Sequence, residues 1–277
     1  MTMAIDRTIS SRGFLPTPLA RIGLIIPSSN RLTEPQLRHF APPELGIHVT
    51  RLQMTGKWNR PLRHLTDDIV RAGGLLADAK VDLVVFHCTG HAMEEGPEGD
   101  ARTREAITRA TGIAATSTAA AVQEAIAALS LKRLILLTPY EQDVNDHEID
   151  YLRQIGVGVV GDVALALAGS DDYLAQPPER WLELAVQNAR DDADGYFLSC
   201  TNTTQIEAIA PIERRLGKPV INSNQAVLWS GSNGCAANSV PCTVRRGSGG
   251  CSRAPYNLPF ERPNSERRRN FAGHSSR

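Results

Sequence analysis

Short apolar runs alternate along the chain with longer stretches in which apolar residues recur at helical spacing. The runs are rich in Val, Ile and Leu and are not polar at alternate positions, which is typical of parallel strands covered on both faces. They predict strands at 21–27, 47–53, 81–87, 132–138, 157–163, 194–199 and 218–222. The stretches between them predict helices at 32–40, 62–79, 99–111, 117–129, 142–155, 178–190 and 204–216. This alternation predicts an α/β fold with parallel sheets.

The alternating pattern occurs twice along the chain. Pro27 and Cys88 are 61 residues apart, and so are Pro139 and Cys200. The segment 112–122 aligns without a gap on 217–227. We therefore expect two pseudo-symmetric parallel-sheet halves, 21–129 with Cys88 and 130–229 with Cys200. Because ligands gather beyond the carboxyl ends of parallel strands, where both cysteines lie, we expect the active site between the halves.

The two ends of the chain depart from this pattern. Residues 1–20 are polar and are interrupted by Pro16 and Pro18, so we expect a flexible N-terminus and no signal peptide. Residues 230–277 are rich in Gly, Ser, Asn, Pro and Arg and have no apolar periodicity, although the repeat predicts a helix there. Two interpretations of this atypical tail are open: a shifted reading frame, and a native disordered extension.

Composition narrows the class of protein. The hydrophobic fraction of 42% in 277 residues is enough for the core of one large or two small domains. The formal net charge is zero, although residues 230–277 alone carry +6 from eight Arg and two Glu. We expect no nucleic-acid partner, and no membrane partner because no apolar stretch reaches the roughly 20 residues that span a bilayer. Two cysteines in the first 229 residues do not suggest a disulfide scaffold, so a reduced, cytoplasmic protein is expected.

Cys88 and Cys200 each end an apolar run and precede small polar residues, Thr89 in the first half and Thr201 and Asn202 in the second. A lone cysteine in such a place is most simply a small core side chain. The matched positions of the two thiols favour chemistry instead. Backbone N–H groups at such a junction lower a thiol pKa and can bind a carboxylate. A thiolate can add to an activated carbon or remove an acidic proton.

Further polar side chains are expected near the same strand ends. Asn30 and Tyr140 follow the first strand of each half and offer neutral donors to a carboxylate, although Asn30 also suits loop capping. His91 is placed to tune the Cys88 thiol, whereas His87 is expected to be packed. We expect no metal, because no second Cys or His pair lies at ligand spacing. We also expect no nucleotide cofactor, because the sequence has no glycine-rich phosphate motif.

Several motifs together resemble a known group of enzymes. They are Pro27-Ser-Ser-Asn30, Cys88, Thr138-Pro-Tyr140, Leu198-Ser-Cys200 and Glu213-x-x-x-Gly217-Lys-Pro-Val. This combination resembles the maleate cis-trans isomerase and arylmalonate decarboxylase branch of the aspartate/glutamate racemase superfamily. The resemblance covers about residues 20–229. It implies two similar α/β domains with the site between them, and a reaction that needs no cofactor.

The resemblance also implies roles for the candidate residues. Cys88 would add as a thiolate to the double bond of maleate, and rotation and elimination would release fumarate. Cys200 would protonate the adduct carbon and later take the proton back. The carboxylates would be held by Asn30 and Tyr140, with Thr89, Thr201 and Asn202 beside the thiols. The family has a further carboxylate-binding Asn near 169–174, where this chain has Gly-Ser-Asp-Asp-Tyr-Leu.

Three alternative functions stay open at this point. A two-thiol racemase of an amino acid or related acid is disfavoured by Ser28-Ser29-Asn30, since such racemases usually carry an acidic residue in that loop. An arylmalonate-type decarboxylase is disfavoured by Cys88, since that class keeps only the second cysteine. A small-acid binding protein or an inactive relative is the third alternative. In the preferred interpretation the partner is a small dicarboxylate, and the chain is expected to form a homo-oligomer.

Overall fold

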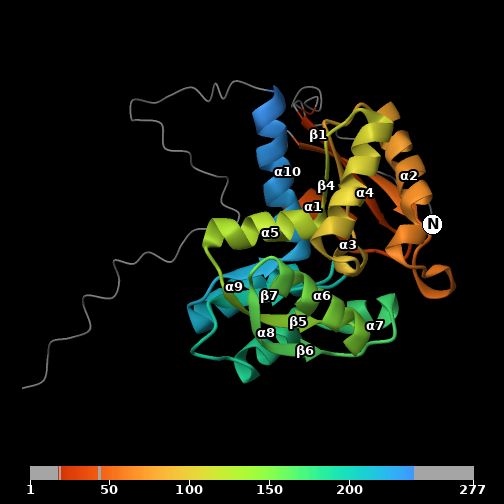
Figure 1. Ribbon diagram of the computed structural model, residues 1–277. Coiled ribbons are helices and arrows are strands. Elements are labelled where there is room, and N and C mark those ends of the chain that lie inside the picture. Colours follow the sequence, from red (N-terminus) through yellow and green to blue (C-terminus); the bar gives the residue numbers. More distant parts are fainter. Residues whose placement is uncertain (1–17, 19, 43–44, 240–277) are drawn as a thin grey trace, which may run out of the picture.

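The computed structural model describes residues 18, 20–42 and 45–239 of the chain, folded around two four-stranded parallel sheets (Figure 1). The first sheet has the order β2-β1-β3-β4 and the second has the order β6-β5-β7-β8. The strands are β1 (Ala20–Pro27), β2 (Leu45–Leu52), β3 (Leu83–Phe86), β4 (Ala115–Ser117), β5 (Arg133–Thr138), β6 (Gly158–Ala164), β7 (Gly195–Leu198) and β8 (Val220–Asn222). The same order in both sheets confirms the predicted pair of pseudo-symmetric α/β halves.

Seven helices lie where the apolar spacing predicts them. They are α1 (Thr33–Phe40), α2 (Thr66–Asp78), α4 (Gly96–Thr111), α5 (Thr118–Leu129), α6 (Gln142–Gln154), α8 (Pro178–Gln187) and α9 (Gln205–Leu216). Local sequence explains several of their ends. Both α4 and α9 stop at a glycine in the left-handed region, Gly112 with φ 71° and Gly217 with φ 65°. The two glycines are equivalent in the repeat, so each half ends its helix in the same way.

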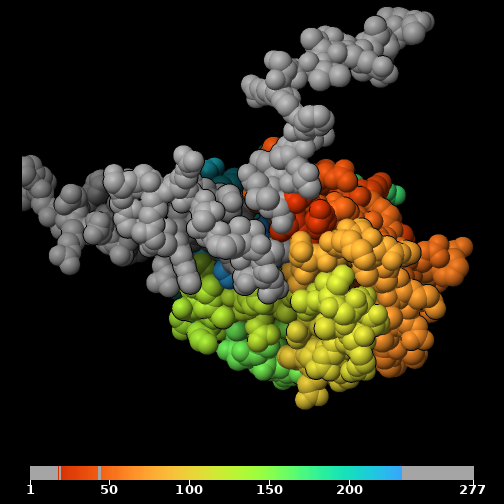
Figure 2. Space-filling view, turned by 90° about the horizontal axis from the view of Figure 1, so that it is seen from above, coloured from red at the N-terminus to blue at the C-terminus, as the bar shows by residue number. Residues whose placement is uncertain are grey.

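Some elements differ from the sequence-based expectation. The helix predicted at 62–79 begins with a separate 3-10 turn, Leu62–His64, before α2. The short helices α3 (Thr89–Met93) and α7 (Ser170–Ala175) were not predicted, because five or six residues carry too little periodicity. Strand β4 was also missed, since it has only three residues and two of them are polar. On the outer surface of the first half, α2 and α4 pack side by side (Figure 2). None of the described helices is long and apolar enough to cross a membrane.

The last helix, α10 (Ser223–Ser239), corrects the expected domain boundary at 229. The helix that the repeat predicts after Val227 is present. It continues to Ser239, so residues 230–239 belong to the fold. Apolar periodicity did not show this, because Gly, Ser and Asn follow Trp229. At the other end, β1 already begins at Ala20, inside the segment expected to be flexible. The remaining expectations for 1–17 and 240–277, including the shifted frame, lie outside the described residues.

Two helices are exchanged between the halves. Helix α10 follows the second sheet but contacts β1 and β3 of the first sheet, beside which it runs in Figure 1. Helix α5 follows the first sheet but contacts β8 of the second. The buried side chains of α5 and of α10 belong to one apolar cluster that also includes Leu134 and Phe197 of the second sheet. Because burying each large apolar side chain stabilises by about 1.5–3 kcal/mol, this shared core fixes the halves against each other.

Gly195 offers a test of the close packing in the second sheet. A Cβ at this position would lie 2.8 Å from the backbone oxygen of Pro219, which accepts the ladder hydrogen bond from Tyr196. We expect Gly195→Ala to destabilise the fold by about 1–3 kcal/mol, measured as a lower Tm by circular dichroism. Gly161→Ala in β6 is the matched control, because its nearest neighbour is a flexible arginine methylene at 3.4 Å. Equal Tm values for the two variants would contradict this account.

Candidate active site

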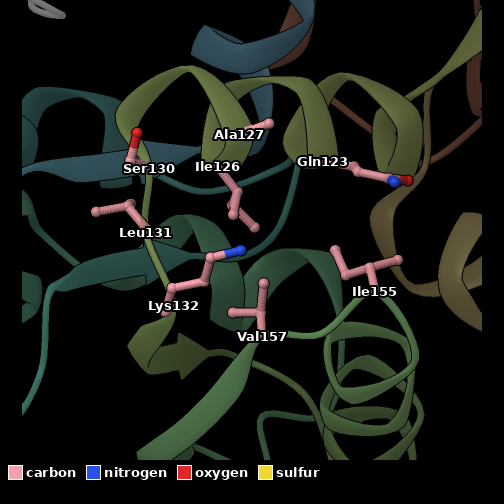
Figure 3. Close-up of a pocket in the computed structure, with 8 residues that line it drawn as sticks. All are labelled: Gln123, Ile126, Ala127, Ser130, Leu131, Lys132, Ile155 and Val157. Atoms are coloured by element: carbon pink, nitrogen blue, oxygen red, sulfur yellow. The ribbon is translucent and has the colours of Figure 1, made fainter.

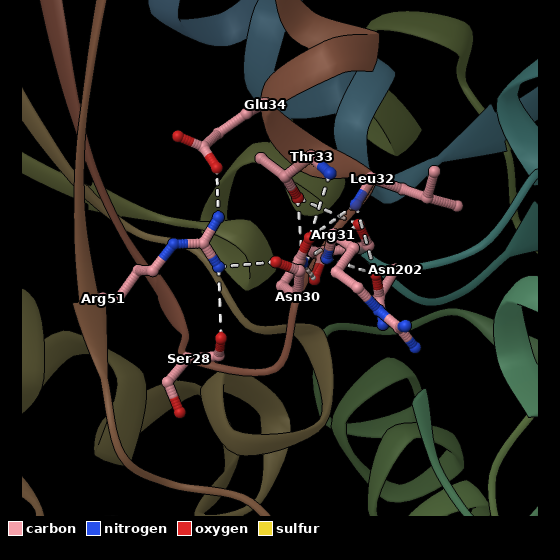
Figure 4. A network of polar contacts seen from close by, with 9 residues as sticks. Ser28, Asn30, Arg31, Leu32, Thr33, Glu34, Arg51 and Asn202 are labelled. Atoms are coloured by element: carbon pink, nitrogen blue, oxygen red, sulfur yellow. Dashed lines mark hydrogen bonds and ion pairs between the residues drawn. The ribbon is translucent and has the colours of Figure 1, made fainter. Parts of the chain in front are cut away.

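The loops after β1 and β7 meet at the junction of the halves and hold each other in place (Figure 4). The Asn30 amide donates to the Thr201 hydroxyl at 3.0 Å and to the Thr201 carbonyl at 3.2 Å. In return, the Asn202 side-chain oxygen accepts the backbone N–H groups of Arg31 at 2.8 Å and of Leu32 at 3.3 Å. Three of the predicted substrate-binding residues therefore come together, and two of them hold the start of α1 from opposite halves.

Asn30 is only 1% exposed, and its side chain is largely committed to the protein. Its oxygen accepts the N–H groups of Leu32 and Thr33, and its amide also donates to the Thr33 hydroxyl at 3.0 Å. These bonds satisfy donors at the first turn of α1 that have no partner within the helix. The capping role that the sequence offered as the alternative for Asn30 is therefore present. Its role toward a substrate stays a prediction.

Cys200 follows β7 with an unusual backbone. Its φ is 143°, in a region that side-chain-bearing residues rarely adopt, so the surrounding contacts must hold it there. The Cys200 N–H donates to the Ser223 hydroxyl at 3.2 Å, and the sulfur accepts the Asn202 N–H at 3.3 Å. Burial raises the pKa of the thiol to about 11, against the opposing hydrogen bond with Tyr140 and the nearby N–H groups. At neutral pH Cys200 therefore carries its proton.

Cys88 precedes α3 and is half-buried. Its Sγ lies 3.6 Å from Nδ1 of His91, as the sequence suggested for a residue that tunes the thiol. Burial raises the pKa of Cys88 to about 12 and outweighs the His91 N–H, which acts in the opposite direction. The expectation that backbone N–H groups lower the thiol pKa is right for their own contribution. It is wrong for the net shift, because desolvation is larger.

His91 is the titratable side chain in contact with the Cys88 thiol. Burial lowers the pKa of His91, so the imidazole is neutral at pH 7. It also hydrogen-bonds the Arg60 backbone, and a backbone oxygen can only accept. A neutral imidazole has a lone pair on one of its two nitrogens, and Nδ1 is the nitrogen that faces Cys88.

One hydroxyl connects the two cysteine loops. Ser223, at the start of α10, accepts a hydrogen bond from the Thr89 hydroxyl at 2.9 Å as well as from the Cys200 N–H. The charge of a Cys200 thiolate raises the pKa of Cys88, as expected for two thiols that share one site. The predicted residues Cys88, Thr89 and Cys200 are therefore brought together through Ser223.

Two tyrosines complete one wall of the site. The rings of Tyr140 and Tyr173 meet edge to face, with their centroids 6.0 Å apart. Burial raises the pKa of both, and negative charge on Cys200 and Cys88 raises it further. Tyr140 was predicted. Tyr173 was not, because it follows Asp171 and Asp172 in a short polar segment whose position relative to the thiols is set by tertiary contacts. Asp171 instead pairs with Arg31 across the halves, where both side chains are largely exposed.

His87 is packed, as the sequence analysis expected. The ring is fully buried between the Thr118 hydroxyl, 2.9 Å from Nδ1, and the Asn224 side-chain oxygen, 2.8 Å from Nε2. Because that oxygen only accepts, His87 carries its proton on Nε2. Burial lowers its pKa to about 4, so it is neutral in the physiological range. Among the described residues, no group of three or more His, Cys, Asp or Glu side chains is arranged to hold a metal ion.

A separate hollow of about 240 Å³ lies away from these residues (Figure 3). It is lined by Gln123, Ile126, Ala127, Ser130, Leu131, Lys132, Ile155 and Val157. Lys132 and Val157 immediately precede β5 and β6, so the hollow lies at the amino edge of the second sheet. Cys200 lies beyond the carboxyl edge of the same sheet. The hollow is therefore not part of the thiol site.

Comparison with known proteins agrees with this geometry. A family model described as arylmalonate decarboxylase matches residues 22–241. The chain belongs to this family. The maleate isomerase of Geobacillus stearothermophilus is 25% identical over 223 residues, which cover 76% of this chain and 89% of that protein. The arylmalonate decarboxylase of Bordetella bronchiseptica is 31% identical over 143 residues, which cover 51% and 60%.

A solved structure extends the comparison of this family member to three dimensions. It is a mutant of the Nocardia farcinica maleate cis-trans isomerase with a covalently bound succinylcysteine intermediate. The TM-score is 0.72 at 25% identity, with 78% of this chain and 92% of that chain covered. The predicted branch of the racemase superfamily and the prediction of an enzyme are therefore confirmed.

The cross-half bonds of Asn30 can be tested by Asn30→Ala. This change removes the Asn30 amide from the Thr201 hydroxyl and the Asn30 oxygen from the Thr33 N–H, so we expect a loss of about 1–3 kcal/mol and a lower Tm. Ser29→Ala is the neighbouring control, because Ser29 bonds only the half-exposed Thr55 within its own half. If Asn30→Ala melted at the same temperature as Ser29→Ala, the hydrogen bonds between Asn30 and Thr201 would not contribute to stability.

Proposed function

We propose that this protein is a cofactor-independent cis-trans isomerase of a small unsaturated dicarboxylate, converting maleate to fumarate. The observation that carries the proposal is the pair of cysteines at equivalent strand ends, connected through Ser223. The covalent succinylcysteine in the Nocardia relative supports addition of a cysteine to the substrate. It is a saturated four-carbon diacid joined to sulfur, which is what addition of a thiol across the double bond of maleate would give.

In the proposed reaction Cys88 is the nucleophile. Its proton passes to Nδ1 of His91, and the thiolate forms a C–S bond to one alkene carbon of maleate. The electron pair of the double bond moves to the neighbouring carbon, where the adjacent carboxylate delocalises it. Cys200 is protonated at rest and donates its proton to that carbon, which completes a succinyl adduct.

The second half of the reaction reverses these steps after rotation. The former double bond is single in the adduct, so the two carboxylates can turn to the trans arrangement. The Cys200 thiolate takes the proton back, the C–S bond breaks, and fumarate leaves. His91 returns the proton to Cys88, so no atom or electron is gained or lost. Tyr140, Thr201 and Asn202 would hold the carboxylates through neutral donors, without adding a positive charge. Asn30 and Thr89 already donate to Thr201 and Ser223, so they would act on the substrate by positioning these loops.

The raised pKa values of both thiols fit this sequence of events. A buried thiolate beside a dianion would be strongly unfavourable, so the resting site keeps both protons. Cys88 ionises only when its proton can pass to His91 and its charge can pass on to the substrate carbon. The site therefore forms the thiolate at the moment of addition rather than storing it.

The proposal is tested by proton NMR of the folded protein with maleate, in which fumarate should appear. Cys88→Ser and Cys200→Ser should each reduce turnover by about a thousandfold or more while the circular dichroism spectrum is unchanged. Cys251→Ser is the matched control and should keep full activity, because that thiol is not one of the proposed pair. Near-wild-type turnover of either site variant would remove the two-thiol mechanism.

Arylmalonate decarboxylation is a second candidate, favoured by the 31% identity to the Bordetella enzyme. The same variants separate the two. A decarboxylase of that class needs only the second cysteine, so Cys88→Ser would retain release of carbon dioxide from an arylmalonate. Loss of all activity in both cysteine variants would favour isomerisation.

A further inference from the structure

Glu148 of α6 is a buried carboxyl group that the proposed reaction does not use. Its side chain is fully buried, and Oε1 accepts a hydrogen bond from the Ser199 hydroxyl at 2.8 Å. Oε2 is also buried and has no hydrogen-bond partner among the described residues. Ser199 immediately precedes Cys200 and anchors to the sheet through its N–H, which donates to the Leu137 carbonyl at 2.9 Å. The carboxyl therefore bonds the residue that immediately precedes Cys200, a proposed catalytic thiol.

The repeat places a neutral amide at the equivalent position of the first half. Cys88 and Cys200 are 112 residues apart, and the same interval separates Gln36 from Glu148. Both ends of the Gln36 amide are bonded, to the Thr203 carbonyl at 2.8 Å and to the Asn224 side chain. The first half thus has a satisfied, uncharged group where the second half has a carboxyl with one free oxygen.

The groups around Glu148 do not neutralise it. Helix α6 packs against α3, α4 and β6, and Val144, one turn before Glu148, approaches Gly90 of α3. Three titratable groups on these elements have other partners: His91 lies beside Cys88, Asp100 pairs with Arg104, and Asp162 accepts from Asn145. No cation on these elements bonds Glu148. A charge on Glu148 does, however, affect Cys88, Cys200 and Tyr140, since it raises the pKa of each.

A carboxyl in this environment is protonated at neutral pH. Burial raises the pKa of Glu148 to about 8, and the Ser199 hydrogen bond only partly opposes the shift. Protonation also gives Oε2 the character of a hydroxyl and removes the need for a buried charge without a counter-ion.

We propose that Glu148 is a positioning residue that acts in its neutral form: it holds Ser199 and the Cys200 loop while keeping fixed negative charge away from both thiols. Its ionisation places a charge beside a site that must form a thiolate and bind a dianion. This inference deepens the proposed function, because it explains how an acidic side chain can lie next to such a site. Thiol chemistry tests it without any substrate.

The test compares Glu148→Gln with wild type in the rate of alkylation of Cys88 and Cys200 by iodoacetamide between about pH 6 and pH 10. Gln stays neutral, so above about pH 8 we expect both thiols to react about tenfold faster in the variant, which corresponds to a thiol pKa lower by one unit. Below about pH 7 the two proteins should react alike. Asp146→Asn removes a charge from the exposed face of the same helix and should match wild type. Coinciding profiles of wild type and Glu148→Gln would overturn the proposal.

Ser199→Ala is a second variant that keeps the carboxyl. It removes the hydrogen bond that favours the ionised form, so Glu148 should stay protonated to higher pH. The infrared band of the protonated carboxyl should then disappear at higher pH than in wild type, and should be absent from Glu148→Gln throughout. A buried carboxyl that is already ionised at about pH 6 would contradict the proposal even if Glu148→Gln failed to fold.

Turnover separates this inference from the proposed function. If maleate is the substrate, KM should rise above about pH 8 in wild type and not in Glu148→Gln, since the charged carboxyl repels the dianion. If no diacid is turned over, the proposed function fails, whereas the alkylation and infrared results still decide the role of Glu148. If maleate is turned over and the KM of Glu148→Gln rises above about pH 8 as it does in wild type, the inference is overturned and the proposed function is not.

Discussion

The exchange of hydrogen bonds between the loops after β1 and β7 is the interaction on which the site depends. The first half alone would leave the Arg31 N–H without the Asn202 oxygen, and the second half alone would leave the Thr201 hydroxyl without the Asn30 amide. Asn30 and Asn202 satisfy them reciprocally. Since an unsatisfied buried polar group costs about 1–3 kcal/mol, the halves are fixed in register where the chemistry is proposed. The unusual backbone of Cys200 can persist only in such an over-determined loop.

Burial has opposite consequences for stability and for reactivity at this junction. The exchanged helices α5 and α10 close the core over both sheets; Cys88 packs against this core, and Cys200 is 4% exposed. Excluding water strengthens each hydrogen bond there, but it also raises the pKa of Cys88 and of Cys200. Donors near each sulfur oppose the shift without cancelling it. A site built in this way favours proton transfer that is concerted with bond formation, because a free thiolate is costly.

The duplicated pattern in the sequence was sufficient to predict the two halves, the parallel sheets and the meeting of Cys88 with Cys200. It could do so because apolar runs and their spacing are local properties that identify strands and helices, and their repetition along the chain identifies the two halves. The repeat predicted a helix where α10 lies, but apolar periodicity did not show how far it extends. Its residues beyond Trp229 are small and polar, and the helix is specified by packing on the first sheet, about 200 residues away in the chain. Tyr173 and Glu148 were not assigned to the site because their significance lies in contacts between distant segments.

The two copies of the unit have diverged in the polar groups that lie behind the thiols. Where the first half has His87, bonded to Thr118 and Asn224, the second has Ser199, bonded to a carboxyl. The first thiol has a neutral imidazole within reach, and the second has a tyrosine hydroxyl and backbone N–H groups. Matched backbones thus place two identical thiols in unlike surroundings. A thiol beside a proton acceptor is suited to attack, whereas one surrounded by donors is suited to give a proton and take it back, so the asymmetry of the neighbours supplies a division of roles that the symmetry of the fold does not.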